Sequence, residues 1–202
     1  MSDVIILLST QFNFNWNIVE LTAVFFSIIY VILATKENIL CWVAAMISVS
    51  LYIYICYNAN LFAETGLQIF YLIMAVYGYY NWNNNKKTKI IEWNTKKHLI
   101  IIFIGLTISF LLGFYLSIYS ASRMPIIDSF TTVFSIIATY MVTQKILENW
   151  LYWIVIDAVS IYLYFNRDLH LSSLLFIVYT ILACIGYFAW LKNKNTKCSK
   201  LL

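Results

Sequence analysis

Segments of about 20 mostly apolar residues recur along the whole chain of 202 residues. Each segment is long enough to cross about 30 Å of hydrocarbon as a helix. Charged residues make up only 11% of the chain, whereas they make up about 25% of a typical soluble domain. The short alternating segments typical of a membrane barrel are missing from the sequence. The chain is therefore predicted to be an all-α integral membrane protein.

Seven transmembrane helices are expected, at about 17–35, 39–57, 61–82, 98–119, 128–146, 149–165 and 169–191. The connectors on one side of the membrane would hold only Arg123 and Arg167. The connectors and the tail on the other side would hold Lys36, Lys86, Lys87, Lys89, Lys96, Lys97, Lys145, Lys192, Lys194, Lys197 and Lys200. Because cytoplasmic loops carry an excess of Lys and Arg, we expect the N-terminus outside and the C-terminus in the cytoplasm.

Other classes of protein are not indicated. Asp3 stands where a signal peptide would be positive, so no cleavable signal is expected. The net charge of +4 follows from the lysine-rich side and does not indicate a nucleic-acid partner. The four cysteines show no CxxC spacing, so we expect neither a metal site nor another cofactor; they are Cys41, Cys56, Cys184 and Cys198.

The chain matches itself without a gap when it is shifted by 108 residues. The letters FSII at 26–29 recur at 134–137, and GYYNW at 78–82 matches GYFAW at 186–190. We therefore expect two three-helix bundles related by an axis along the membrane normal. This parallel 3+1+3 pseudo-repeat is the arrangement of SWEET-type sugar transporters.

The repeat also predicts the organisation of the single membrane domain. The predicted parts are a first bundle at 17–82, a connecting segment at 83–127, a second bundle at 128–191 and a tail at 192–202. The connecting segment would contain a lysine-rich loop, a linker helix at about 98–119 and an outer loop.

One face of the sixth span combines aromatic and polar side chains. Residues three and four apart share a helix face, so Trp150, Trp153, Asp157 and Ser160 form one stripe. Asp157 would lie near the middle of the membrane, where a charge costs about 2.5–3.5 kcal/mol. A flat cationic ring is attracted to indole faces. We therefore expect Asp157 to meet a cationic ligand; the alternative is a protonated or water-solvated packing carboxylate.

The first copy lacks this charge, because Asp157 matches Val49 and Trp153 matches Ala45. In contrast, Trp42 matches Trp150. Symmetry alone therefore does not account for the second indole and the carboxylate, and they are the first candidates for a ligand site.

Further candidate ligand groups lie on the third span. Glu64, Gln68 and Tyr71 share one face at spacings of four and three residues. An amide at Gln68 suits recognition of a hydroxyl or a carboxamide; the alternative is a hydrogen bond between helices.

The tryptophans at the expected cytoplasmic helix ends are interpreted as an aromatic belt at the headgroup level: Trp42, Trp82 and Trp190, with Trp150 left ambiguous.

Several motifs together resemble the PnuC family of bacterial vitamin transporters over nearly the whole chain. They are LQIFY at 67–71, YGYYNW at 77–82, DS at 128–129 and LENWLYW at 147–153. The resemblance implies uptake of a cationic vitamin precursor, chiefly nicotinamide riboside, across the bacterial inner membrane by facilitated diffusion with alternating access. It also implies a homotrimer embedded in lipid and a cytoplasmic kinase that acts on the product.

The resemblance makes Trp150, Trp153, Gln68 and Tyr71 ligand contacts. The chain departs from the nicotinamide riboside branch at Asp157, where that branch typically has Asn. Thiamine is also a flat aromatic cation, so a thiamine transporter of the same family is the alternative.

Two other classes of function are weighed against transport. An intramembrane enzyme would use Asp157 as acid or base, but the chain lacks a nearby histidine, a serine nucleophile motif and an HExxH pair. The buried charge and the carrier-like repeat disfavour a receptor or an assembly subunit.

Overall fold

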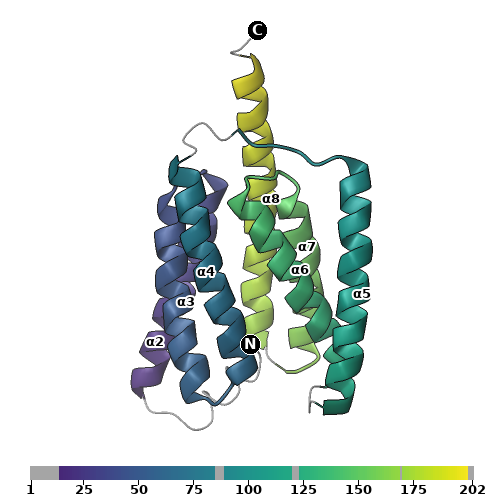
Figure 1. Cartoon of the computed structure of the whole chain (residues 1–202). Helices are drawn as coiled ribbons and strands as arrows, with labels where there is room; N and C mark the ends of the chain where they lie inside the picture. The colour runs from purple at the N-terminus through teal and green to yellow at the C-terminus, as the bar shows by residue number, and fades with distance from the viewer. Residues whose placement is uncertain (1–13, 85–88, 120–122, 169, 200–202) are drawn as a thin grey trace.

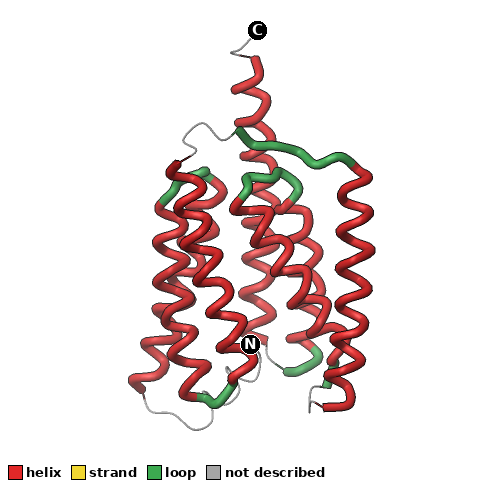
Figure 2. Tube along the Cα trace, viewed as in Figure 1, coloured by secondary structure: helices red, strands yellow, loops and turns green. Residues whose placement is uncertain are grey.

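The computed structural model describes residues 14–84, 89–119, 123–168 and 170–199. These residues form seven α-helices joined by short loops (Figures 1 and 2). The helices are α2 (Phe14–Thr35), α3 (Leu40–Asn58), α4 (Phe62–Asn84), α5 (Thr95–Tyr119), α6 (Pro125–Thr143), α7 (Asn149–Phe165) and α8 (His170–Ser199). The expected all-α fold is confirmed.

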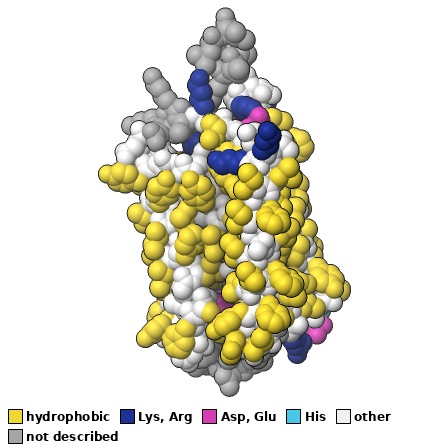
Figure 3. Space-filling model, turned by 45° about the vertical axis from the view of Figure 1, so that its right-hand side comes forward, with side chains coloured by type: hydrophobic (Ala, Val, Ile, Leu, Met, Phe, Trp, Pro, Cys, Tyr) yellow, Lys and Arg dark blue, Asp and Glu magenta, His cyan; other side chains and the backbone are white. Residues whose placement is uncertain are grey.

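The helices are those of a membrane protein. Five of them, α2, α3, α5, α6 and α8, are long and apolar enough to cross a membrane. Helix α7 is apolar but has only 17 residues, and α4 is more polar along its length. Hydrophobic side chains cover the flank of the molecule (Figure 3). Most of the Lys and Arg side chains in view gather at its upper end, which is called the lysine-rich end below (Figure 3).

The observed helix ends differ from the expected ones mainly in the second half of the chain. Helix α6 begins and ends three residues earlier than expected, because Pro125 suits a first helical turn and Lys145 adopts a left-handed φ of 54° in the turn that follows. Helix α8 extends through Ser199, so part of the expected tail is helical. Asp3, Lys86, Lys87 and Lys200 lie outside the described residues.

Matching positions of the two halves have the same local geometry. Trp42 packs edge-on against Trp82 at 5.4 Å and 87°. The matching pair, Trp150 and Trp190, packs at 5.4 Å and 89°. We propose from these repeated contacts that the two bundles are the units of the repeat.

The two bundles dock through reciprocal contacts. Helix α2 packs against α8, and the matching helices α6 and α4 also pack against each other. Tyr71 of α4 is 2.6 Å from Ser135 of α6. The matching residues make the same contact in the opposite direction, because Tyr179 of α8 is 2.5 Å from Ser27 of α2. This exchange of partners is the signature of a pseudo-twofold axis between the bundles.

The aromatic-belt interpretation of the tryptophans is wrong. Trp42, Trp82 and Trp190 are at most 4% exposed and belong to one buried cluster. Trp190 donates a hydrogen bond to the Ala34 carbonyl of the other bundle at 3.0 Å. These indoles therefore hold the bundles together at the lysine-rich end and do not face lipid headgroups.

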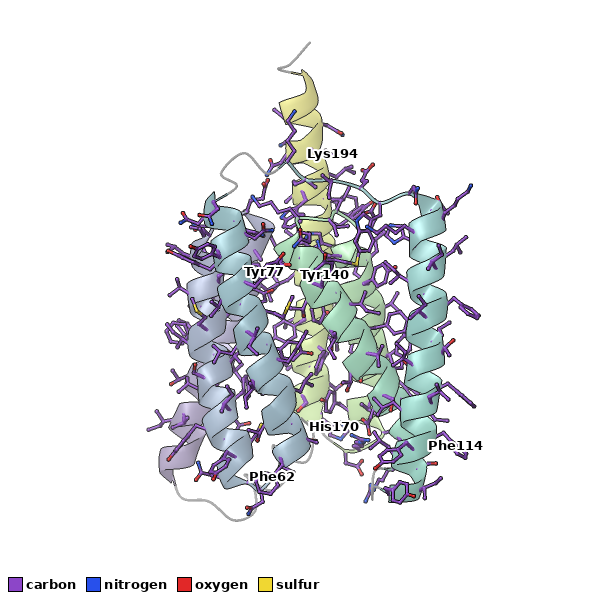
Figure 4. The ribbon with its side chains drawn as sticks, in the orientation of Figure 1. Phe62, Tyr77, Phe114, Tyr140, His170 and Lys194 are labelled. Carbon is purple, nitrogen blue, oxygen red and sulfur yellow. The ribbon has the colours of Figure 1, made fainter. Side chains whose placement is uncertain are left out.

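The linker helix α5 stands at the edge of the molecule and packs chiefly against α6 (Figure 1). Its buried residues are small and four apart, namely Gly105, Ser109 and Gly113. Small residues at this spacing let two helix backbones approach closely. Most other side chains of α5 are exposed and apolar, including Phe114, which points outward (Figure 4).

The glycine contacts give a test of the repeated packing. A Cβ at Gly186 would lie 2.7 Å from the Trp150 ring, whereas a Cβ at Gly66 would meet nothing within 4 Å. Crowding a packed site costs about 1–3 kcal/mol, while replacing an open helical glycine by alanine gains up to about 1 kcal/mol. Gly186→Ala should therefore lower the thermal unfolding midpoint of the purified protein, and the matched control Gly66→Ala should not. Equal midpoints for the two variants would contradict this packing.

Candidate functional site

Helix α7 places two buried polar groups side by side in the second bundle. Asp157 is 3% exposed and Ser160, one turn further along, is 4% exposed. Within the described residues, neither side chain has a hydrogen-bond or ion-pair partner. Burying an unpaired polar or charged group is costly, so a pair of such groups indicates a site for a ligand.

Basic side chains do not neutralise Asp157. Arg167 pairs with Asp128 at 2.7 Å at the far end of α7, and Lys145 pairs with Glu37 at 3.6 Å beyond its near end. The described part of the chain therefore leaves Asp157 without a counter-charge inside the bundle.

Tyr179 of α8 faces this region and was missed by the sequence analysis. Its hydroxyl interacts electrostatically with Asp157. Ser27 donates its own proton to the Val24 carbonyl at 2.7 Å, so Tyr179 is the donor in the bond to Ser27. The repeat could have identified Tyr179, since it matches Tyr71. The site therefore lies beside a contact between α2 and α8.

The two predicted tryptophans of α7 have different surroundings. Trp150 is 3% exposed, and its indole N–H is buried without a hydrogen-bond partner in the described structure. Trp42, the matching residue, has the same unpartnered N–H. Trp153 is only partly buried, at the junction of two hydrophobic clusters. Trp150 is thus part of the repeated core, and Trp153 is the indole that the core encloses only in part.

The predicted residues of α4 face the interface from a different helix. Gln68 is 4% exposed and Glu64, one turn nearer the start of α4, is half-buried. Tyr71 donates its proton to Ser135, because Ser135 already donates to the Thr132 carbonyl. Helix α4 meets the second bundle through α6. The structure therefore joins Tyr71 to α6, and the shared role of the α4 residues and the α7 stripe in binding stays a prediction.

Among the described residues, no group of three or more His, Cys, Asp or Glu side chains could hold a metal ion. The arrangement offers one carboxylate, one hydroxyl and one aromatic face. These groups can hold a flat cation.

Comparison with known proteins identifies the family of the chain. A family model described as nicotinamide mononucleotide transporter matches residues 17–192. The nicotinamide riboside transporter PnuC of Escherichia coli is 24% identical over 95% of this chain and 91% of its own length. The riboflavin/roseoflavin transporter RibM of Streptomyces davaonensis is 23% identical over 78% of this chain and 77% of its own length.

A solved structure shares the fold. The crystal structure of the vitamin B3 transporter PnuC superimposes with a TM-score of 0.70 at 22% identity, covering 88% of this chain and 82% of the other. These relatives and this fold are those of transporters and not of enzymes. The chain belongs to the nicotinamide mononucleotide transporter family, which is the PnuC family of membrane transporters.

Proposed function

We propose that this protein carries a flat aromatic cation across the membrane, with nicotinamide riboside as the first candidate. The observation that carries the proposal is the buried Asp157 carboxylate, which has no hydrogen-bond or ion-pair partner within the described residues. Trp153 lies one turn away on the same face and supplies an aromatic surface. The sugar hydroxyls of a riboside find a polar group in Ser160.

The energetics of an empty and a loaded site support a cation. A carboxylate inside a bundle is expensive because the protein interior solvates it poorly. A positive ring seated beside the carboxylate removes that cost, and a cation–π contact adds up to about 2 kcal/mol when the site is dry. A neutral ring gains the stacking but leaves the charge uncompensated.

Thiamine is the second candidate, and the same residue favours it. Its thiazolium ring is a permanent cation, so Asp157 suits it as well as it suits nicotinamide riboside. The relatives include a riboflavin transporter, but riboflavin is uncharged and would not compensate Asp157.

The remaining features of the proposal come from the resemblance and from the charge bias. We propose facilitated diffusion by alternating access in the bacterial inner membrane, with the lysine-rich end in the cytoplasm and the N-terminus outside. The resemblance to PnuC transporters supports a homotrimer and a kinase that traps the product.

Replacing the carboxylate should stabilise the empty protein. Asp157→Leu removes an unpaired buried charge and keeps the volume similar, so the free energy of unfolding should rise by about 1–3 kcal/mol. Val49→Leu, at the matching position of the first bundle, is the control and should change stability little. A loss of stability in Asp157→Leu, measured by thermal unfolding without ligand, would mean that the carboxylate already has partners.

The charge requirement can be measured with two ligands of nearly the same shape. Nicotinamide riboside is a cation, and its reduced form is neutral. By calorimetry, the wild-type protein should bind the cation about 10–100-fold more tightly than the neutral form, which corresponds to about 1.4–2.7 kcal/mol. Asp157→Asn keeps a hydrogen-bonding group but should abolish this preference. A preference that survives in Asp157→Asn would contradict the role of the carboxylate, and thiamine in the same assay ranks the two cations.

Of the two tryptophans of α7, Trp153 should contribute to ligand binding and Trp150 to packing. Trp153→Leu should weaken cation binding by about 10-fold, since it removes the aromatic face, and should lower the unfolding midpoint less than Trp150→Leu does. Trp150→Leu opens the core against Gly186 and Trp190 and should cost about 3–5 kcal/mol of stability. Undiminished binding in Trp153→Leu would remove this residue from the site.

A further inference from the structure

Glu37 and Lys145 occupy matching positions of the two copies and meet each other. Each residue lies in the tight turn that follows a helix, with φ of 53° at Glu37 and 54° at Lys145. The Lys145 Nζ is 3.6 Å from the Glu37 Oε2, and their side chains are only 10% and 9% exposed. Residues related by a twofold axis contact each other only when they lie close to that axis. The ion pair therefore marks the axis between the bundles at the lysine-rich end.

The pair is held by residues from both bundles. The Lys145 ammonium lies over the Trp82 ring, 4.5 Å from its centre. Asn193 of α8 donates a hydrogen bond to the Glu37 carboxylate at 3.0 Å. Charges from one bundle thus contact side chains of the other on both sides of the axis.

Other contacts at the same level join the two bundles. Trp82 donates to the Thr143 carbonyl at 3.2 Å, and Gln144 donates to the Tyr77 hydroxyl at 2.8 Å. In Figure 4, Tyr77 of α4 and Tyr140 of α6 lie at the same height where the two bundles meet, below Lys194. The lysine-rich end is therefore closed in this structure, on one side of the buried Asp157.

An ion pair is not the contact that would hold the two bundles together most firmly. The attraction between two buried charges is largely offset by the loss of their hydration, so an apolar contact of similar size would hold as firmly or more so. When the bundles separate, water hydrates both charges again, and this regained hydration offsets the lost attraction between them. Among the contacts at this end, the ion pair can therefore open at a small net cost, whereas the buried tryptophans lose burial energy when the bundles separate.

We infer that Glu37 and Lys145 form a latch at the lysine-rich end, that is, an ion pair that must break before the transport pathway can open at that end. The latch is shut in this structure and opens when the two bundles move apart at that end. This inference rests on the proposed alternating access, but its test uses no substrate, so it can fail without affecting the proposal for Asp157.

Two native cysteines of α3 report on the latch. Cys41 is 0% exposed at the lysine-rich end, in the same buried cluster as Trp82 and Trp190. Cys56 is also 0% exposed, at the opposite end of α3. The background is the full chain with Cys184→Ser and Cys198→Ser, and the readout is modification of the purified protein by a small charged thiol reagent, located by mass spectrometry.

Reversing either charge should open the latch. Glu37→Lys and Lys145→Glu each place like charges together, so Cys41 should react at least 10-fold faster while Cys56 stays protected. The double variant E37K/K145E should restore protection, because both backbones have the same φ and the lysine at position 37 would face Trp190 as Lys145 faces Trp82. The matched control is the more exposed ion pair of Glu92 and Lys194, whose disruption by Glu92→Lys or Lys194→Glu should leave Cys41 protected.

Any one of three results would contradict the inference about the latch. In the first, Cys41 stays protected in both single variants; in the second, Cys41 of the double variant remains as reactive as in the single variants. In the third, Cys56 becomes as reactive as Cys41. The last result would show that the whole bundle has loosened and that the pair is only structural.

Discussion

The Asp157 carboxylate sits near the middle of α7, enclosed by the second bundle and without a hydrogen-bond or ion-pair partner among the described residues. The described basic side chains near the two ends of α7 would not compensate a charge on Asp157, because Lys145 and Arg167 are paired with other carboxylates. Under the proposed function, an incoming cation would compensate that charge. Trp153 and Ser160 lie on the same face, so the groups that would receive the ring and a hydroxyl are already positioned beside the charge.

The repeat explains where this site can lie. Equivalent contacts, such as Tyr71 with Ser135 and Tyr179 with Ser27, tie the bundles together symmetrically. Asp157 breaks the symmetry, because its counterpart is Val49, so the charge lies in one bundle beside a symmetric interface. A ligand bound there would be sensitive to any movement of one bundle against the other. In alternating access, one bundle moves against the other around a site of this kind.

The sequence predicted the membrane class, the seven helices and the stripe on α7, because apolar length and helical spacing are local properties. The sequence did not predict the environment of residues that lie where the two bundles dock. Trp190 has the residue type and the position that are typical of an aromatic belt. Only the packing of α8 on α2 shows that Trp190 is buried and donates a hydrogen bond to the Ala34 carbonyl. Lys145 was counted among the connector charges and Glu37 was not singled out, because their contact depends on the axis, which no single helix defines. The early start of α6 follows from Pro125, which the hydropathy pattern does not take into account.

The central claim is that Asp157 neutralises a flat cation stacked on Trp153. The most direct test is an experimental structure of the protein with bound nicotinamide riboside or thiamine. The account predicts the cationic ring on the Trp153 face, with its charged nitrogen within about 4–6 Å of the Asp157 carboxylate, the range in which opposite charges stabilise each other. A ring bound elsewhere, for example beside Val49 in the first bundle, with Asp157 left without a cation, would contradict it.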